Sequence, residues 1–135
     1  MDIVRVGIIS TVNLEQGTAQ VYYPDRGSTT GQLQLFAFRA EFSPPAVGDQ
    51  VVVLHLSTDS SSGIVMGRFW GEADLPPGGV DYRKNFGADA YEALENGVYT
   101  VRAPDIQMCG SAGSISLAEL VDLKRRVEVL ERDGG

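Results

Sequence analysis

The sequence predicts a mainly β protein in which five short strands close into a barrel, followed by a short β extension and a C-terminal α-helix. The clearest observation is a hairpin at Val47–Trp70, where two apolar runs, 51–56 and 64–70, flank a polar tip at 58–63. Apolar runs of this length bounded by Ser, Asp and Gly are typical of paired strands. Three further strand-like runs precede the hairpin, and a capped heptad pattern follows it near the C-terminal end.

Three strands are expected before the hairpin. Residues 1–13 are rich in Ile and Val, which favour strands, and Gly7 within them predicts a bend or bulge. Residues 18–23 alternate between two faces and end at Pro24, which has no N–H to donate to a ladder. Residues 32–38 place Leu and Ala on one face of a third strand, with Gln and Phe on the other.

Turn-rich segments separate these strands. Residues 25–31 are expected to form a flexible loop, and residues 40–46 form a loop restricted by the Pro44–Pro45 pair. No helix is indicated between the strands. Five short strands arranged in this way match the size and pattern of an OB-fold, which is a five-stranded barrel.

The composition changes beyond the hairpin. Residues 71–79 are rich in Pro, Gly and acids and mark a boundary, and residues 80–93 show no clean period. Short strands are expected at 98–103 and 106–109, and the small residues 110–114 form a link. The predicted domains are 1–77 for the barrel, 78–115 for a short β segment and 116–135 for the helix.

The C-terminal segment carries the signals of a helix that begins at a defined residue. Ser116 is a good N-cap, and Glu119 stands three residues later as the partner of a capping box. Ile115 and Leu120 occupy the two positions of a hydrophobic staple around that cap. The helix is expected to run from Leu117 to about Glu131.

The same helix shows the spacing of a coiled-coil seam. Its apolar residues recur at intervals of three, four and three and occupy heptad positions a and d: Leu120, Leu123, Val127 and Leu130. Arg126 then falls at g and Glu131 at the following e, where neighbouring parallel chains meet with opposite charge. A helix of about 15 residues is marginal in isolation. It is therefore expected to dock either on its own barrel or on copies of itself.

Charge and cysteine content exclude several classes of protein. The formal net charge is −7, and each of the three predicted segments is acidic. General nucleic-acid binding is therefore not expected, because it needs Lys and Arg to displace counterions from phosphates. The single cysteine allows no intramolecular disulfide. Without a signal-peptide pattern or a membrane-length apolar run, a soluble protein made in a reducing cytoplasm is expected.

Two residues, His55 and Cys109, have side chains that can serve in catalysis or metal binding. His55 is the only histidine and has no nearby partner with which to bind a metal, so a packed or surface strand histidine is expected. Cys109 has no neighbour that would lower its pKa, so a buried or semi-buried free thiol is expected. The sequence thus predicts no catalytic, cofactor-binding or metal-binding residue, and no cofactor.

Acidic pairs and aromatic residues also have plainer interpretations. Two pairs of acids, Glu72 with Asp74 and Glu92 with Glu95, lie in acidic stretches and are expected to be solvated. The barrel strands carry aromatic residues that could stack on bases in a basic groove, but this half of the chain holds only four arginines. Core or subunit contacts are therefore expected for these residues, which are Tyr22, Tyr23, Phe36 and Phe38.

Three segments of the barrel together resemble a known family. RVGIISTVNLEQGTAQVYYPDR (5–26), PPAVGDQVVVLHL (44–56) and GIVMGRFWGEADLPP (63–77) stand in the order and spacing found there. Residues 5–77 resemble the N-terminal OB domain of phage baseplate assembly protein V, the central spike of contractile tails. The same domain occurs in the spike proteins of type VI secretion and related contractile injection systems.

The resemblance implies a homotrimer on the tail axis, with its OB domains around a shaft of three intertwined chains. A baseplate hub protein and the tail tube would lie above it, and residues 98–115 would be the shaft. This chain departs from the family in three ways: the shaft is very short, no His-x-His motif closes its end, and a helix follows instead. Membrane contact is therefore expected only through the assembled machine, with a separate spike-tip protein as a further candidate partner.

The sequence thus predicts a non-enzymatic structural protein: the trimeric central spike of a baseplate, or an adaptor between spike and hub. It would be made in the host bacterial cytoplasm and located in the virion tail baseplate or a tail-like particle. The alternatives are an OB-fold module for single-stranded nucleic acid or oligosaccharide, and a small hydrolase that uses His55 or Cys109. The residues expected at the interface between copies are Ile106, Met108, Ile115, Leu117, Leu120, Leu123, Val127 and Leu130.

Overall fold

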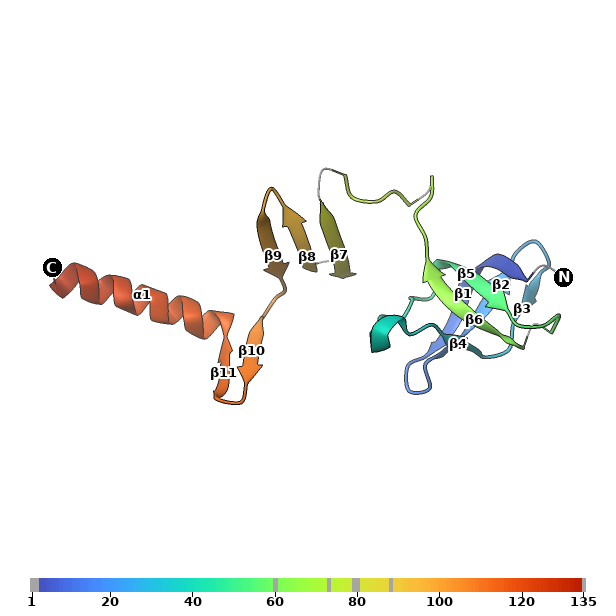
Figure 1. Cartoon of the computed structure of the whole chain (residues 1–135), viewed down its shortest axis with the longest axis horizontal. Coiled ribbons are helices and arrows are strands. Elements are labelled where there is room, and N and C mark those ends of the chain that lie inside the picture. The colour runs from blue at the N-terminus through green and yellow to red at the C-terminus, as the bar shows by residue number, and fades with distance from the viewer. Residues whose placement is uncertain (1–2, 60, 73, 79–80, 88, 135) are drawn as a thin grey trace. The chain divides into compact units, whose positions relative to one another are not determined.

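The structure, a computed structural model, describes residues 3–59, 61–72, 74–78, 81–87 and 89–134. The chain separates into two compact units, Met1–Leu75 and Pro76–Gly135. The first is a closed β-barrel, and the second holds two small sheets and one helix. The protein is therefore mainly β with a C-terminal helix, as the sequence predicts (Figure 1).

Five principal strands form the barrel, with one two-residue strand added. Their sheet order is β1-β5-β6-β4-β2-β3, and an additional pairing of β1 with β2 closes the barrel. The β4–β6 pair is parallel, and the other pairs are antiparallel. The bounds are β1 Val4–Asn13, β2 Thr18–Tyr23, β3 Ser28–Thr29, β4 Leu33–Leu35, β5 Gln50–His55 and β6 Gly63–Arg68.

The long first strand belongs to both sides of the barrel. Its first half pairs with β5 and its second half with β2, and the register shifts between Ile9 and Thr11. The bend expected at Gly7 is thus displaced to this bulge. Gly7 has a different role, because a Cβ atom there would lie 2.8 Å from the ring of Tyr23 and closer still to Val21. The glycine lets β1 pass close to the side chains of β2.

Two expectations between the second strand and the hairpin need correction. Residues 25–31, expected as a flexible loop, include β3, which pairs with the end of β2. The strand expected at 32–38 is only the three residues of β4. Beyond it the chain turns into a short 3-10 helix, Phe38–Ala40, in which Arg39 and Ala40 have positive φ angles of 52° and 59°. Such backbone angles cannot continue a strand.

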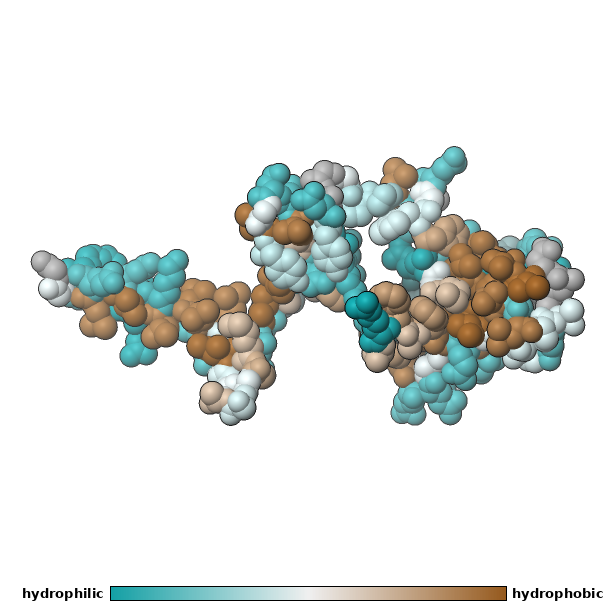
Figure 2. Space-filling model, in the orientation of Figure 1, coloured by the Kyte–Doolittle hydropathy of each residue, from teal (hydrophilic) through white to brown (hydrophobic). Residues whose placement is uncertain are grey.

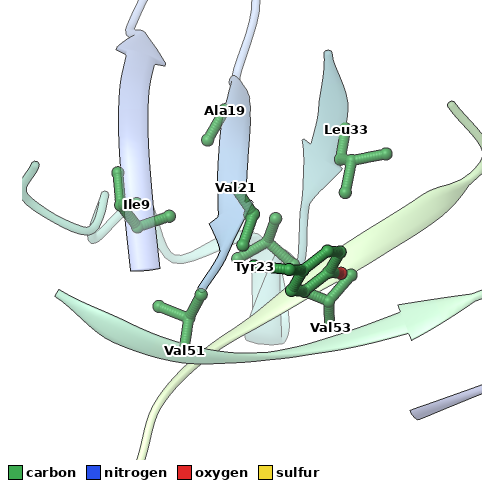
Figure 3. Close-up of a cluster of buried hydrophobic side chains, with 8 residues drawn as sticks. Ile9, Ala19, Val21, Tyr23, Leu33, Val51 and Val53 are labelled. Carbon is green, nitrogen blue, oxygen red and sulfur yellow. The ribbon is translucent and has the colours of Figure 1, made fainter. Parts of the chain in front are cut away.

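The core of the barrel comes from inward-facing residues of each principal strand. These side chains are at most 3% exposed, and Figure 3 shows them converging between the strands. Burying a large apolar side chain contributes about 1.5–3 kcal/mol, so this cluster dominates the stability of the unit. Its members are Ile9, Ala19, Val21, Tyr23, Leu33, Val51, Val53 and Val65.

The second unit contains two antiparallel sheets and the helix. Three strands form a meander: β7 Tyr82–Gly87, β8 Ala90–Glu95 and β9 Val98–Arg102. The strands β10 Gln107–Gly110 and β11 Gly113–Ser116 form a hairpin that leads into helix α1, Leu117–Gly134. The sequence did not predict β7 and β8, because neither shows an apolar alternation. The link expected at 110–114 is the turn of the β10–β11 hairpin together with the start of β11.

Candidate assembly surface

The helix α1 begins where the sequence predicts, and its start is tied to the preceding hairpin. The Oγ atom of Ser116 accepts a hydrogen bond from the backbone N–H of Glu119 (3.1 Å) and donates one to its carboxylate (3.2 Å). The carboxylate thus bonds the serine hydroxyl, whereas a full capping box would bond its backbone N–H. The N–H of Leu117 donates to the carbonyl of Ile106 at 2.7 Å, so strand pairing continues into the first helical residue.

Along its 18 residues, helix α1 has no buried residue among those that the structure describes. Its seam side chains are between 40% exposed, at Leu120, and 70% exposed, at Leu130. Apolar residues are visible along the helix surface in Figure 2. An isolated helix of this length is marginal in water, and most helices gain stability by packing an apolar face. Among the described residues of the second unit, none covers the seam.

The charged residues beside the seam make no ion pair with the described residues of the chain. Within the part of the chain that the structure describes, neither Arg126 nor Glu131 makes an ion pair. Lys124, at the other e position, makes none either. These groups remain available to charges on another chain.

The β10–β11 hairpin presents one apolar face and one polar face. Met108 pairs directly with Ile115, and Cys109 pairs with Ser114 on the opposite face. Ile106 stands two residues before Met108 and shares its face. Ile106 and Ile115 are partly covered, whereas Met108 is 56% exposed. All eight residues expected at the interface thus lie in or beside the hairpin and the helix, and their contact with another copy stays a prediction.

Cys109 is free and exposed, so the expectation of a buried or semi-buried thiol was wrong. The strand that carries it is exposed along its whole length. The residues of the hairpin cover each other only across a two-stranded ladder, which leaves both faces open. Cys109 is therefore a useful chemical probe of the polar face of the hairpin.

In the three-stranded sheet, the carboxylate of Glu92 joins the outer strands. It accepts hydrogen bonds from the hydroxyls of Tyr82 (2.8 Å) and Tyr99, which lie on β7 and β9. These bonds hold the pKa of Glu92 below its usual value, and the bond from Tyr99 has the larger effect. The same bonds raise the pKa of both tyrosines. Glu92 was expected to be a solvated acid, and its hydrogen bonds are exposed to solvent; in addition, its carboxylate ties β7 to β9. Arg102 and Asp89 add an ion pair at 2.8 Å.

His55 lies in the barrel core, 1% exposed, with both ring nitrogens in hydrogen bonds. Its Nε2 atom lies 2.6 Å from the hydroxyl of Tyr23, and its Nδ1 atom lies 3.0 Å from the carbonyl of Ser62. The Arg5 guanidinium stacks 4.4 Å over the Tyr23 ring and pairs with Asp25 at 2.6 Å. This arrangement ties strands together and leaves the imidazole no free nitrogen for proton transfer to a substrate.

Sequence reasoning missed Arg5 and its contacts. Arg5 is 7% exposed and alternates with the buried Gly7 and Ile9, so it points inward. The sequence does indicate this inward position, because residues 5, 7 and 9 fall on the same face of a strand. The Tyr23 ring and the Asp25 carboxylate compensate its charge, and they come from a strand and loop that local patterns do not connect to β1.

A small cavity of about 240 Å³ lies on the barrel, between the β1–β2 turn and the segment after β4. The aromatic rings of Phe36 and Phe42 and the amides of Gln16 and Gln34 are among its lining groups. No lysine or arginine lines it. The cavity therefore offers aromatic rings, amides and the acidic side chain of Glu41, without a cation that would bind phosphate.

The described residues offer no metal site and no membrane-spanning helix. No group of three or more His, Cys, Asp or Glu side chains there is placed to hold a metal ion. Within those same residues, no helix has both the length and the apolar character needed to cross a membrane. Of the acids at 72 and 74, Asp74 forms an ion pair with Arg68.

Comparison of the chain with models of protein families and with curated protein sequences found no match.

Proposed function

We propose that this protein is a non-enzymatic structural component of a phage tail or tail-like contractile injection system. In this role it forms the trimeric central spike of the baseplate, or an adaptor between the spike and its hub. Two features support the proposal: the closed five-stranded barrel, which matches the resemblance in the sequence, and a second unit whose own described residues leave its apolar surfaces uncovered.

The observation that carries the proposal is the lack of a core in the second unit. Ala93 is the one buried residue among those described between Pro76 and Gly135. Exposed large apolar residues occur in its sheet, its hairpin and its helix, as at Tyr99, Met108 and Leu123. Burial of such side chains is the main source of folding stability. A segment of this kind is stabilised when several copies cover it around one axis, as in a symmetric oligomer.

The partners of this assembly are other copies of the chain, the baseplate hub and the tail-tube proteins, with a separate tip protein at the distal end. The chain is made in the host bacterial cytoplasm and is incorporated into the tail baseplate. It contacts a membrane only as part of the assembled machine. No nucleic acid or cofactor is required for this role.

Electron microscopy of labelled particles tests the proposal. Tails or tail-like particles are purified from the producing bacterium and decorated with an antibody against the barrel. We expect label at one end of the particle, on its axis, and none along the tube. An antibody against the tube protein serves as a positive control for decoration. Particles that lack the chain altogether would refute the proposed location.

One observation favours a second function, a binding module for neutral oligosaccharide. The cavity beside Phe36 and Phe42 has aromatic rings, amides, the acid Glu41 and no lining cation, which suits a sugar better than a nucleic acid. Titration of the protein with neutral oligosaccharides and with single-stranded DNA at low salt discriminates the two. A Phe42→Ala variant would lose sugar binding if the cavity is the site. Absence of binding to either ligand leaves the structural role alone.

A further inference from the structure

We infer, on the basis of the proposed oligomer, that residues 106–134 form a stem that binds a second copy of itself in parallel and in register. The stem consists of the β10–β11 hairpin and helix α1. The neighbouring copies of this segment cover both the apolar face of the hairpin and the heptad seam of the helix. The partner is thus the same segment of another chain, in the same orientation.

The hairpin and the helix are continuous at their junction. Strand pairing extends from Met108–Ile115 through the hydrogen bond between the Leu117 N–H and the Ile106 carbonyl. Helix α1 starts at that same residue, Leu117, and Ser116 caps it. The junction has no intervening loop, so a neighbour that binds the helix must also come close to the hairpin.

Charge complementarity indicates that the partner is the helix itself. In a parallel coiled coil, a g residue of one chain lies near the following e residue of the other. Glu119 at g would meet Lys124 at e, and Arg126 at g would meet Glu131 at e. Both pairs have opposite charges, and neither is formed within the chain among the described residues.

The hairpin decides the orientation, which the charges alone do not. An antiparallel pair would also bring Glu119 near Arg126 and Lys124 near Glu131. It would place the two hairpins at opposite ends of a helix pair about 27 Å long. The apolar face around Met108 would then stay exposed in both chains. A parallel pair places the two hairpins side by side, so that this face is covered together with the seam.

The hairpin also fixes the register of the helices. The seam contains only Leu and Val, and it lacks the buried polar residue that often sets register in coiled coils. A shift by one heptad would keep Leu or Val in contact along part of the helix. It would separate Met108 and Ile115 of the two chains. In-register pairing alone covers the hairpin and the seam at once.

Disulfide trapping in the full-length chain tests the orientation. Gly134 is the a position after Val127, so a Gly134→Cys variant, made with Cys109→Ser, places thiols together only in a parallel stem. Disulfides form when Cα atoms lie within roughly 4.4–6.8 Å. We expect most chains to be linked in pairs on mild oxidation. The matched control is Arg132→Cys at the outward f position, which should link few chains. Failure of Gly134→Cys to link, or equal linking of both variants, would overturn the parallel arrangement.

Thiol labelling tests the hairpin part of the stem. Cys109 lies on the polar face, and Met108→Cys in a Cys109→Ser chain lies on the apolar face. In the assembled protein, we expect maleimide to label residue 108 roughly tenfold more slowly than residue 109, because only the former is covered. After denaturation the two rates should be equal. Equal rates in the assembled protein would show that the hairpin is not in the interface.

These results are independent of the tail location. A protein found on the tail axis whose Gly134→Cys variant does not link would retain the proposed function and lose the parallel stem. If the Gly134→Cys variant links but the protein is absent from tail particles, the parallel stem would stand and the proposed function would be refuted.

Discussion

The hydroxyl oxygen of Tyr23 and the Nε2 atom of His55 lie 2.6 Å apart inside the barrel, between strands β2 and β5, which do not pair with each other. Because the Ser62 carbonyl can only accept, the Nδ1 atom of His55 carries the proton of that bond. With the proton on Nδ1, the Nε2 atom is the ring nitrogen that can accept a hydrogen bond from the Tyr23 hydroxyl. The pair thus links two strands through the interior of the barrel.

Removal of the tyrosine hydroxyl should destabilise the barrel. Tyr23→Phe keeps the ring and leaves the buried Nε2 of His55 without its hydrogen-bond partner, which costs about 1–3 kcal/mol. Urea denaturation of the full chain, followed through a barrel signal, measures the loss. Tyr22→Phe is the matched control, because Tyr22 is 38% exposed and should change the free energy of unfolding by less than about 0.5 kcal/mol. Equal effects of the two variants would contradict a role for the Tyr23–His55 bond.

The same tyrosine should make the barrel sensitive to alkaline pH. Burial raises the pKa of Tyr23 above its ordinary value of 10.0, and the nearby Arg5 and Arg26 partly oppose this. The folded chain then retains a proton that the unfolded chain releases. The contribution of Tyr23 to the free energy of unfolding is therefore fully present below pH 10, and it is lost as the pH rises through the folded-state pKa. Urea midpoints across this range should decrease more steeply for wild type than for Tyr23→Phe. Parallel slopes would show that the hydroxyl titrates alike in both states.

Acid should weaken the three-stranded sheet through Glu92. Hydrogen bonds from Tyr99 and Tyr82 lower the pKa of Glu92 from its ordinary value of 4.5. The contribution of the Glu92 carboxylate to the stability of the sheet is fully present above pH 4.5. It is lost as the pH falls through the folded-state pKa. We expect Glu92→Gln to remove this part of the acid dependence, measured from tyrosine signals of the sheet. Glu95→Gln at the end of the same strand is the control. An unchanged acid profile in Glu92→Gln would exclude the cross-strand tie.

A methyl group at Gly7 should disrupt the packing of β1 on β2. In Gly7→Ala the new Cβ would meet Val21 and the ring of Tyr23, both of them core side chains. Overpacking of a core typically costs about 1–3 kcal/mol. Gly87→Ala is the matched control, since a Cβ there meets no atom within 4 Å and its φ is not positive. Thermal unfolding compares the two, and a Gly7→Ala chain as stable as its control would contradict the close contact.

The sequence predicts best those elements whose pattern is local. On β5, Val51, Val53 and His55 alternate toward the core, and the hairpin with β6 follows within two residues of its expected bounds. The cap at Ser116 is likewise a local signal. The strands β7 and β8 escaped prediction because Ala93 is their only buried residue, so no face is marked as apolar.

The candidate surface was only partly predictable for a related reason. Heptad spacing identifies the seam of α1 from sequence, because apolar residues at a and d repeat within a few residues of each other. The apolar face of the hairpin depends on the register of Met108 with Ile115, which only the fold establishes. The inward position of Arg5 likewise depends on Tyr23 and Asp25, which are distant along the chain.

Charge in the seam should separate the copies while the barrel stays folded. Leu123 and Val127 are 50% and 44% exposed in the single chain, so aspartate there need not disturb the fold of one copy. In an oligomer, aspartate at these positions would bury a carboxylate among Leu and Val of other chains. Burial of an unpaired charge costs more free energy than the roughly 1.5–3 kcal/mol that one buried apolar side chain contributes. We expect Leu123→Asp and Val127→Asp to sediment as monomers at concentrations where the wild type is oligomeric. Val129→Asp is the matched control, because Val129 is 42% exposed and occupies the outward c position, so its oligomer should persist. If all three variants associate like wild type, or if the wild type itself is monomeric at high concentration, another surface must cover the helix.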